Sequence, residues 1–573
     1  MHLLKTLSVL LYVALLLNSC HKKPVEWSGP QLTPPRHQLT AEQLLAGDTL
    51  PLIDMSFFAR PAWAQPSPLR FSGAISFDET EIIYPIERAY YPGENVFPAI
   101  TFDFISNQDE LIPIRQEILV NSLQSKDAWN VLVGTGEIWK EAEDGEWCRA
   151  SFPLSLTDSY IGQVRNCVAT FLYKHDSVSN VYLQCSQETA DLNDHQVGNM
   201  RVMLPARYQP RKYTDSLLVI EKRNRIKAGR LPVSPLSAID ANNSIAHYFE
   251  KSLYTNASTS LGAVIMDGII YLQPPKTRHG LYPYPNEMRH AVYSVSKSMT
   301  GALALFYFAE RYGTEIFTEL ISDHVPVLSG LPEWRGVTFS HTLNMVTGTE
   351  GGEDAPRLYE TIVKARTAEE AIRNVAKLGD KPGTPGEHFN YASTNLFVLS
   401  YALQKYVEQK EGRGISYWNL ISENVLAPLG ADDFTVLRTV EAEGSQGIPL
   451  LAYGALPTLD NAAKIALLFA NEGNYNGQQL LNREKCREAM GRTKWPGYST
   501  HNDYRGEHYR HSFWATNLKT NENNTEVTYM LGYGGNYVWF FPDNVIAVRF
   551  MDEYDLDFKE LVKGIGEVRG SHR

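Results

Sequence analysis

The chain has 573 residues, which is too long for one ordinary hydrophobic core and therefore predicts two or more domains. Its composition, with 43% hydrophobic and 21% charged residues, is typical of a folded protein and excludes a disordered one. The net charge of −12 and the absence of any lysine- or arginine-rich run argue against a general nucleic-acid binder, so we expect no nucleic-acid partner.

Residues 1–20, MHLLKTLSVLLYVALLLNSC, contain one lysine and then an apolar run from Leu7 to Leu17. This run is too short for a comfortable membrane span and has the length of a signal-peptide core. The ending Leu-Asn-Ser-Cys resembles the lipobox of bacterial lipoproteins, which implies that Cys20 is acylated and becomes the first residue of the mature protein. The alternative is an ordinary signal peptide with a cysteine near its cleavage site. We expect an exported cell-envelope protein, bound to the membrane through several acyl chains on Cys20.

Two segments of different character follow. Residues 21–69 begin with a proline-rich stretch that lacks periodicity, which predicts a tether. Residues 70–206 contain short β-branched and aromatic runs separated by turn formers, which predict an all-β sandwich or barrel domain. Export implies an oxidising compartment, so one disulfide is expected among Cys148, Cys167 and Cys185. These three cysteines allow three pairings, and the sequence does not choose between them.

Residues 207–236 read as a linker with a short helix, and a second domain fills residues 237–573. This domain opens with two apolar runs around Asp267-Gly268, a type I′ hairpin signal. Several helical stretches follow, and strand-like runs return near the C-terminus before a last helix. The predicted fold class is α+β, with an antiparallel sheet completed from both ends of the domain, flanking helices and a helical insert.

The stretch YSVSKSMT places Ser294 and Lys297 three residues apart at the start of an apolar helical run. Residues i and i+3 share one helix face, so the lysine amine can reach the serine hydroxyl. A serine needs a proton acceptor to act as a nucleophile, and a buried lysine can serve as one. The pattern alone has little weight, because Ser19 and Lys22 have the same spacing. The plain alternative is a helix start with a solvated lysine.

Ser294-Val-Ser-Lys297 resembles the active-site helix of class C β-lactamases and penicillin-binding-protein-like serine hydrolases. Further segments resemble this family in the same order, over about three-fifths of the chain: VTFSHTLNMVTG, PGEHFNYASTNLF, GALPTLDNAAKIALLF and LGYGGNYVWFFP. The resemblance implies a β-lactamase-like sheet with a helical subdomain. It also implies that Tyr391 is the tyrosine of the second motif, with Ser393 as its small polar companion.

The mechanism implied by the resemblance is acyl transfer without a cofactor. Ser294 attacks a carbonyl, Lys297 takes or relays its proton, and Tyr391 passes a proton to the leaving group. Backbone N–H groups of Ser294 and of the closing strand near Tyr533 are expected to hold the oxyanion, so the register of Gly532-Tyr533-Gly534 matters. The expected substrates are small esters, amides or short peptides.

One position departs from the family pattern. β-Lactamases and peptidases of this family carry Lys-Thr-Gly, or His for Lys, on the closing strand, whereas this chain reads Met530-Leu531-Gly532. The missing cation favours esterase or short-amide hydrolysis over a β-lactamase or D-Ala-D-Ala peptidase. A second alternative is an inactive, surface-anchored binding protein that keeps the fold.

Other polar residues of the second domain receive structural interpretations. His341 is expected at a helix start, and Gly351-Gly352 in a flexible pocket loop. The histidines of HNDYRGEHYRH (His501, His508 and His511) fit no standard zinc spacing, so they are assigned to loops and the pocket rim, and no metal site is expected.

Overall fold

The computed structural model describes residues 36–84, 93–120, 122–123, 128–158, 162–188, 199–240, 242–243, 245–250, 259–349, 351–501, 503–519, 524–551 and 561–565. The predicted signal segment, with Cys20, lies outside the described residues. Among the described helices, none is long and apolar enough to cross a membrane.

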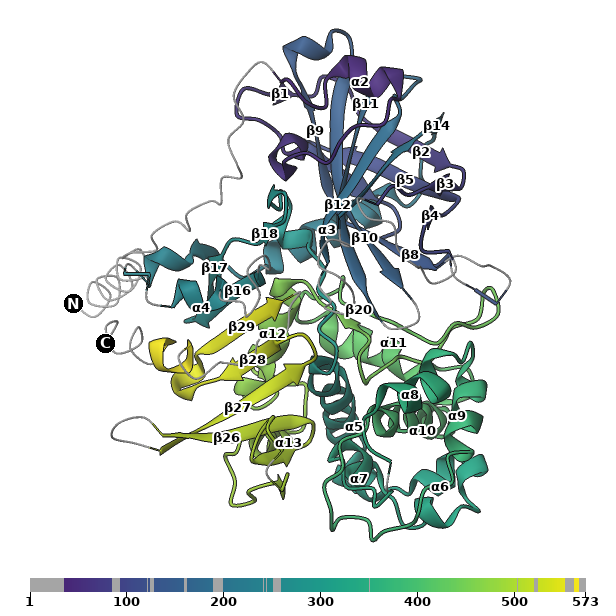
Figure 1. Ribbon diagram of the computed structural model, residues 1–573, viewed down its shortest axis with the longest axis vertical. Coiled ribbons are helices and arrows are strands. Elements are labelled where there is room, and N and C mark those ends of the chain that lie inside the picture. The colour runs from purple at the N-terminus through teal and green to yellow at the C-terminus, as the bar shows by residue number, and fades with distance from the viewer. Residues whose placement is uncertain are drawn as a thin grey trace, which may run out of the picture.

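An all-β domain forms the upper part of the molecule in Figure 1. Its 12-stranded sheet has the order β13-β12-β11-β10-β9-β6-β5-β2-β14, with β1 paired to β9 and with β8 placed between β7 and β10. The bounds are β1 (Gln65–Pro66), β2 (Ser72–Phe77), β5 (Ile100–Asn107), β6 (Glu110–Pro113), β7 (Glu117–Ile118), β8 (Trp129–Val133), β9 (Gly136–Lys140), β10 (Cys148–Asp158), β11 (Val164–Tyr173), β12 (Val181–Glu188), β13 (Met200–Leu204) and β14 (Arg207–Pro210); β3 (Thr80–Glu81) and β4 (Val96–Phe97) form a separate pair.

This sheet curls around one aromatic core. The ring of Phe71, which precedes β2, lies 5.6 Å from Phe171 of β11, although four strands separate β2 from β11 in the sheet order. Phe102, Phe104 and Phe152 belong to the same buried cluster. Side chains from these distant strands can meet only because the sheet bends back on itself. The sequence left open whether the domain is a sandwich or a barrel, and the structure shows one curled sheet.

Residues 36–69 belong to this domain rather than to the predicted tether. They form the helix α2 (Ala41–Ala46), the 3₁₀ turn η1 (Met55–Phe58) and strand β1. Leu39, Leu44 and Phe58 are fully buried in a cluster that includes Val168 and Tyr182 of the sheet. The tether prediction is wrong here because burial of these few apolar side chains depends on tertiary contacts that local polarity does not reveal.

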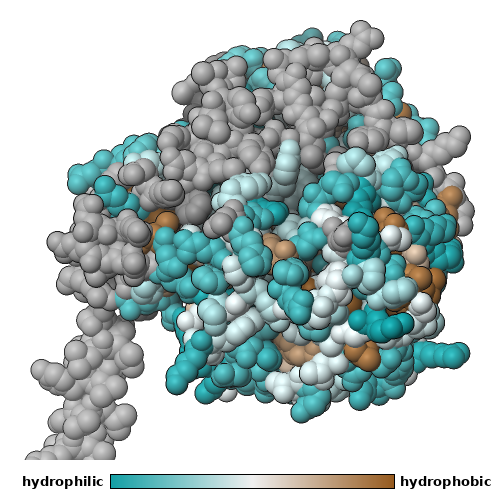
Figure 2. Space-filling model, turned by 60° about the horizontal axis from the view of Figure 1, so that its bottom comes forward, coloured by the Kyte–Doolittle hydropathy of each residue, from teal (hydrophilic) through white to brown (hydrophobic). Residues whose placement is uncertain are grey.

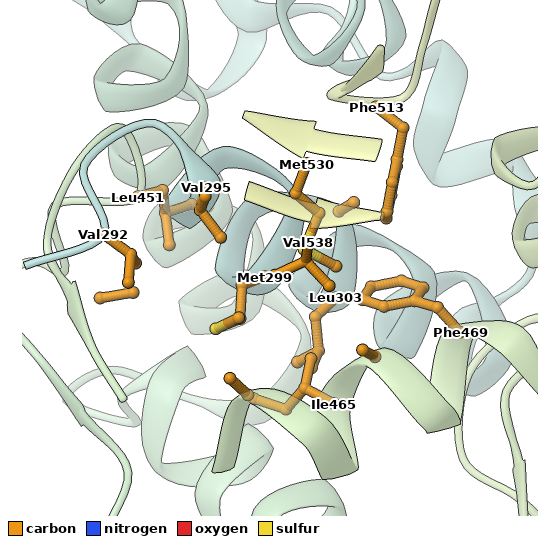
Figure 3. Close-up of a cluster of buried hydrophobic side chains, with 14 of the residues drawn as sticks. Val292, Val295, Met299, Leu303, Leu451, Ile465, Phe469, Phe513, Met530 and Val538 are labelled. Atoms are coloured by element: carbon orange, nitrogen blue, oxygen red, sulfur yellow. The ribbon is translucent and has the colours of Figure 1, made fainter. Parts of the chain in front are cut away.

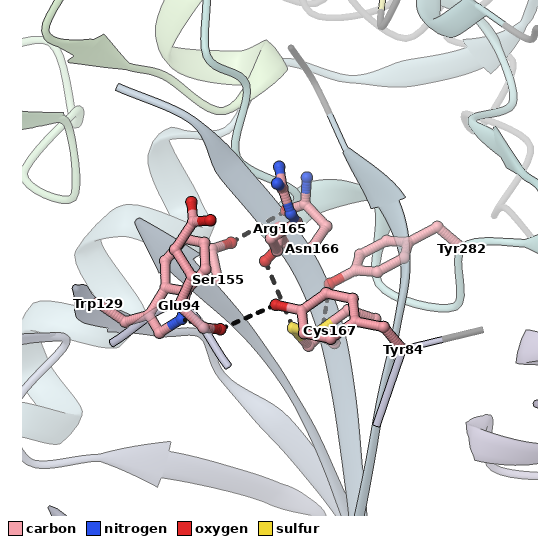
Figure 4. Close-up of a disulfide and its surroundings, with 9 residues drawn as sticks. Tyr84, Glu94, Trp129, Ser155, Arg165, Asn166, Cys167 and Tyr282 are labelled. Atoms are coloured by element: carbon pink, nitrogen blue, oxygen red, sulfur yellow. Dashed lines mark hydrogen bonds between the residues drawn. A yellow bond between two sulfur atoms is a disulfide. The ribbon is translucent and has the colours of Figure 1, made fainter. Parts of the chain in front are cut away.

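Cys167 and Cys185 form the disulfide that the sequence left open, whereas Cys148 is buried and unbonded. The two bonded cysteines are opposite each other on the neighbouring strands β11 and β12. Figure 4 shows the disulfide at Cys167. The Tyr282 hydroxyl, from the second domain, donates a hydrogen bond of 3.0 Å to the carbonyl of Cys167. The disulfide therefore lies next to the contact between the two domains.

The predicted linker, residues 207–236, is structured throughout. Strand β14 pairs with β2 at one edge of the β-domain sheet. The helix α3 (Ser216–Gly229) follows, and β15 (Val233–Pro235) then joins the second sheet in parallel with β17. On α3, Arg223 donates hydrogen bonds to Glu110 of the first domain and to Glu287 of the second. The segment thus acts as an interdomain bridge, not a free connector.

The second domain is built on a nine-stranded sheet with the order β15-β17-β16-β29-β28-β27-β26-β25-β24. Its first hairpin turns at Asp267 and Gly268, whose φ angles of 52° and 74° fit the predicted type I′ turn. The bounds are β16 (Thr259–Met266), β17 (Ile269–Gln273), β24 (Tyr498–Ser499), β25 (His508–Arg510), β26 (Phe513–Lys519), β27 (Asn524–Gly532), β28 (Asn536–Phe540) and β29 (Ile546–Met551). The sheet is completed from both ends of the domain, so the predicted α+β class is confirmed.

Helices fill the chain between β17 and β24. Figure 3 shows Met299 and Leu303 packed with Ile465 and Phe469 against Met530, Val538 and Phe513 of the sheet, so one sheet face is covered by two helices. The helical segments are α4 (Ala246–Glu250), η5 (Lys297–Ala302), α5 (Leu303–Tyr312), α6 (Ile321–His324), α7 (Phe339–Leu343), α8 (Ala355–Leu358), η9 (Tyr359–Val363), α9 (Ala368–Ala376), α10 (Ser393–Glu411), α11 (Tyr417–Ile421), η10 (Ser422–Leu426), α12 (Leu459–Ala470) and α13 (Arg483–Ala489).

Smaller elements complete the domain. Short strand pairs are β18 (Lys276–Thr277) with β19 (Gly280–Leu281), β20 (Thr435–Val436) with β21 (Ala455–Leu456), and β22 (Asn474–Tyr475) with β23 (Gln478–Gln479), and residues 561–565 are helical. On the face drawn in Figure 2, apolar residues occur in small groups among hydrophilic ones.

Candidate active site

Ser294 lies in a tight turn that leads into the π-helical segment η5 and the apolar helix α5. The turn is held by backbone hydrogen bonds from Ser296 to Tyr293 and from Lys297 to Ser294. Tyr293 has a φ of 44°, which is uncommon for a residue other than glycine, so the backbone is strained next to Ser294. The Ser294 side chain stays partly exposed while its neighbours on both sides are buried.

Lys297 is buried, with 1% of the residue exposed. Its Nζ donates to Ser294 Oγ at 2.6 Å, to Ser393 Oγ at 2.8 Å and to the carbonyl of Ala452 at 3.1 Å. Three acceptors match the three N–H donors of an ammonium group. The ammonium also lies 4.8 Å from the centre of the Tyr391 ring. Folding therefore brings Tyr391 and Ser393, of the second motif, next to the pair Ser294 and Lys297, which lies far from them in the sequence.

Tyr391 precedes the helix α10 and is nearly buried among aromatic side chains. Its ring lies 5.5 Å from that of Trp514 and 6.1 Å from that of Tyr509. The Tyr391 hydroxyl makes no hydrogen bond to any of the described residues, so the phenol is held by packing alone. Ser393 begins α10, and its hydroxyl connects Lys297 to Glu353, to which it donates at 2.7 Å.

The end of strand β27 lies against the Ser294 turn. A Cβ added to Gly532 would be 2.1 Å from the carbonyl oxygen of Val292, so only glycine allows this approach. Gly532, Tyr533 and Gly535 line the pocket that contains Ser294. Gly534, which the sequence also proposed, is not among the described residues that line it. The predicted closing strand therefore lies beside Ser294, and Gly532, Tyr533 and Gly535 are its residues that line the pocket.

The pocket is small, with a volume of about 120 Å³, and is partly open to solvent. Two exposed aromatic side chains, Tyr504 and Tyr533, stand among its lining residues. Its lining consists of Ser294, Glu353, Tyr391, Tyr504, Arg505, Trp514, Leu531, Gly532, Tyr533 and Gly535.

Arg505 places a positive charge in the pocket that sequence reasoning missed. Its guanidinium stacks 4.2 Å from the centre of the Tyr391 ring and 5.0 Å from that of Trp514. Nε donates to Asp503 at 2.8 Å, and Nη2 bonds the second Asp503 oxygen. Burial acts to lower the pKa of Arg505, but the hydrogen bonds of Asp503 outweigh it and raise this pKa, so the group stays charged. Among the described residues, none accepts a hydrogen bond from Nη1.

Arg505 supplies a cation from a different element than the closing strand. The sequence Met530-Leu531-Gly532 on β27 has no charged residue, but the loop before β25 brings a guanidinium to the pocket beside this strand. The sequence prediction considers the segment HNDYRGEHYRH for its histidines and gives Arg505 no role.

Glu353 is the second residue that sequence reasoning missed. It follows Gly351-Gly352, the predicted pocket loop, and its exposed carboxylate accepts hydrogen bonds from both the backbone N–H and the hydroxyl of Ser393. The loop prediction pointed to the correct place, but nothing in the local sequence connects Glu353 to Ser393.

Two of the histidines have structural contacts. His341 accepts from the Thr338 backbone in a capping box at the start of α7, in agreement with the helix-start prediction. His511 lies in a turn, which agrees with the loop prediction. It is buried between Asn344 and Glu488 rather than at the pocket rim, so the rim assignment is wrong for this residue. Within the described ranges, no group of three or more His, Cys, Asp or Glu residues is arranged to hold a metal ion.

The fold and this site define a class of protein, one with a serine–lysine pair on a helix beside an antiparallel sheet. Residues 269–551, just under half of the chain, match the family model described as Beta-lactamase. This match supports the serine hydrolase family for the second domain, whose fold is β-lactamase-like. A search of curated proteins found no match to the chain.

Solved structures with a similar domain include a penicillin binding protein from Bacillus halodurans, with 14% identity and a TM-score of 0.41, covering 58% of this chain and 98% of that one. A class C beta-lactamase has 15% identity and a TM-score of 0.40, covering 59% and 97%. A family VIII carboxylesterase has 13% identity and a TM-score of 0.40, covering 61% and 97%. Similarity at this level does not transfer an activity to this chain.

Proposed function

We propose that the second domain is a serine hydrolase that cleaves an ester or amide bond through an acyl-enzyme on Ser294. The observation that carries the proposal is the distance of 2.6 Å between Lys297 Nζ and Ser294 Oγ, in a pocket that admits a small acyl group. Lys297 is buried beside the partly exposed Ser294, so the amine and the hydroxyl are held together where a substrate carbonyl can reach the serine.

In the proposed reaction, Ser294 Oγ attacks the substrate carbonyl while Lys297 takes the hydroxyl proton. The oxyanion is held by the backbone N–H groups of Ser294 and Tyr533, supported by the close approach of Gly532 to the Ser294 turn. Tyr391, whose hydroxyl has no partner among the described residues, passes a proton to the leaving group. Water then attacks the acyl-serine and releases the acid.

Arg505 extends the proposal to substrate selection. The free Nη1 edge of a guanidinium that is fixed by stacking and by Asp503 is suited to a substrate carboxylate. This feature keeps a β-lactamase or D-Ala-D-Ala peptidase as the second candidate, because such substrates carry a carboxylate near the scissile bond. Turnover of nitrocefin, or a stable penicillin adduct on Ser294, favours that candidate over an esterase or short-amide hydrolase.

A fluorophosphonate probe, which reacts with activated serines, tests the proposal. We expect labelling of the wild type and none of Ser294→Ala. Ser298→Ala is the matched control, since Ser298 is buried in the adjoining segment η5 and donates to the Ser512 carbonyl instead. Lys297→Met is expected to lose labelling, whereas Lys464→Met removes another buried lysine outside the pocket and keeps it. A folded wild type that is never labelled would support the inactive binding protein.

The cellular setting is part of the proposal. The signal-like N-terminus with Cys20 supports export and a lipid anchor in the bacterial cell envelope. Metabolic labelling with a fatty-acid analogue, compared between wild type and Cys20→Ala, tests this point.

A further inference from the structure

The hydrogen bonds around Ser393 connect the buried lysine to an exposed carboxylate. Lys297 Nζ donates to Ser393 Oγ at 2.8 Å, and Ser393 Oγ donates in turn to Glu353 Oε1 at 2.7 Å. The other Glu353 oxygen accepts from the Ser393 backbone N–H, which fixes the carboxylate at the start of α10. The chain of bonds therefore has one direction, from the ammonium through a hydroxyl to the carboxylate.

This direction matters because an ammonium group cannot accept a proton. Lys297 with three acceptors around it is in the charged form, and it must lose one proton before it can take the proton of Ser294. Bulk water does not reach a side chain that is this deeply buried. Glu353, in contrast, is exposed and can exchange its proton with solvent.

We propose that Glu353 is a proton acceptor for Lys297, acting through Ser393. Lys297 Nζ gives a proton to Ser393 Oγ while the Ser393 hydroxyl proton moves to Glu353 Oε1. The products are a neutral amine, an unchanged serine hydroxyl and a neutral carboxylic acid, so the number of protons in the site does not change. Because Glu353 acts on Lys297 through Ser393, it is a positioning residue that relays a proton. This inference rests on the proposed function of Ser294 and Lys297.

Other ionisable groups near this chain do not compete with Glu353. Tyr391 lies over Lys297, and Arg505 lies over Tyr391. Tyr453 and Tyr509 are buried, and burial, with the nearby charge of Glu353, raises the pKa of both phenols. Asp158 also acts on Tyr453. Among the described carboxylates that act on these groups, Glu353 is the one that the hydrogen bonds of Ser393 join to Lys297.

The relay predicts that a carboxylate is needed at this position. Glu353→Ala removes the group that takes the proton from Lys297, so the reaction of Ser294 should slow. Because Glu353 is exposed, a small carboxylate from solution can occupy the space that the variant leaves and restore part of the lost rate. A residue with a merely structural role would not be replaced in this way.

The experiment measures the second-order rate constant of fluorophosphonate inactivation at one pH, with and without added formate. Glu353→Ala is expected to react about 10²-fold more slowly than the wild type and to be accelerated by formate, whereas the wild type is not. Ser393→Ala, which removes the intervening hydroxyl, is expected to be slow with or without formate. Glu360→Ala, at an exposed glutamate outside the pocket, is the matched control and keeps the wild-type rate.

A wild-type rate in Glu353→Ala, or a lowered rate that formate does not restore, would overturn the relay. If Glu353→Ala fails to fold in a thermal melt, Glu353→Asp replaces it, and a rate as low as that of Ser393→Ala for this variant, which retains the carboxylate, would contradict the relay as well. A folded wild type that is never labelled would overturn the proposed function itself, which is a separate result from labelling that does not depend on Glu353.

Discussion

Asn166 of the β-domain holds the backbone of Arg289 at both of its polar groups. Its Oδ1 accepts from the Arg289 N–H at 3.1 Å, and its Nδ2 donates to the Arg289 carbonyl at 2.8 Å. Both residues are buried, and Arg289 shortly precedes Ser294 in the chain. Tyr284 reinforces the contact by donating to the Ser151 carbonyl. The β-domain thus fixes the segment that leads into the nucleophile.

Replacing Asn166 by leucine tests this relationship. The variant keeps a similar volume but leaves the N–H and the carbonyl of Arg289 buried without partners, at a cost of about 1–3 kcal/mol for each group. We expect a lower free energy of unfolding in denaturant and slower fluorophosphonate labelling of the folded protein. Asn424→Leu, at an exposed amide, is the control. Unchanged stability and labelling would show that the β-domain does not position the site.

Gly532→Ala tests the approach of β27 to the Ser294 turn. The new Cβ would lie 2.1 Å from the Val292 carbonyl oxygen, so the strand end must move away and the proposed donor at Tyr533 moves with it. Loss of one oxyanion donor typically lowers kcat by about 10²–10³-fold. We therefore predict a fall of this size in ester hydrolysis.

The comparison variant is Gly330→Ala, since nothing lies within 4 Å of a Cβ at this glycine. Its activity is expected to equal that of the wild type. Wild-type rates in Gly532→Ala would mean that this strand end does not contribute to the oxyanion site.

Arg505→Gln tests carboxylate recognition. We expect the wild type to prefer esters or amides that carry a free carboxylate over the matched neutral methyl esters, and the variant to lose about ten- to hundredfold of this preference. The measurement is kcat/KM for each matched pair. Arg413→Gln, at an exposed arginine away from the pocket, should keep the preference. An equal preference in wild type and Arg505→Gln would assign the cation a purely structural role.

Buried His290 makes the free energy of unfolding depend on pH in the acidic range. The imidazole is buried, neither ring nitrogen has a hydrogen-bond partner among the described residues, and burial, with the neighbouring Arg289 charge, lowers its pKa to about 3. The unfolded chain binds this proton below about pH 6.5, but the folded chain does not. The free energy of unfolding should therefore fall by about 1.4 kcal/mol for each pH unit below that value, until the folded pKa is approached.

His290→Phe removes this titration and should give a flatter decline in urea unfolding between about pH 6 and pH 4. The control His175→Phe changes an exposed histidine and should follow the wild type. Equal slopes for His290→Phe and wild type would show that His290 is not the group responsible.

Much of the second domain could be predicted from the sequence. The hairpin at Asp267-Gly268 and the apolar run after Lys297 have local signals, namely turn residues and apolar periodicity, that survive in the folded structure. The spacing of Ser294 and Lys297 depends only on helix geometry at the start of η5, so their contact follows from local structure.

The missed residues depend on tertiary structure. Glu353 and Arg505 come from loops whose course is set by packing on Ser393, Tyr391 and Trp514, and no local pattern encodes these contacts. The same reason explains the wrong tether boundary, since the burial of Leu39 and Leu44 depends on tertiary contacts with the sheet of the β-domain. Charged pocket residues from loops are visible only once the fold is known.

The sharpest test of the acyl-serine mechanism is the site at which a substrate acylates the protein. The wild type is mixed with an activated ester, quenched in acid and digested, and the peptides are analysed by mass spectrometry. The mechanism predicts an added acyl mass on Ser294 that disappears in Ser294→Ala and accumulates when deacylation is slowed. Full hydrolysis of the ester by Ser294→Ala, or an acyl group on another residue, would contradict it.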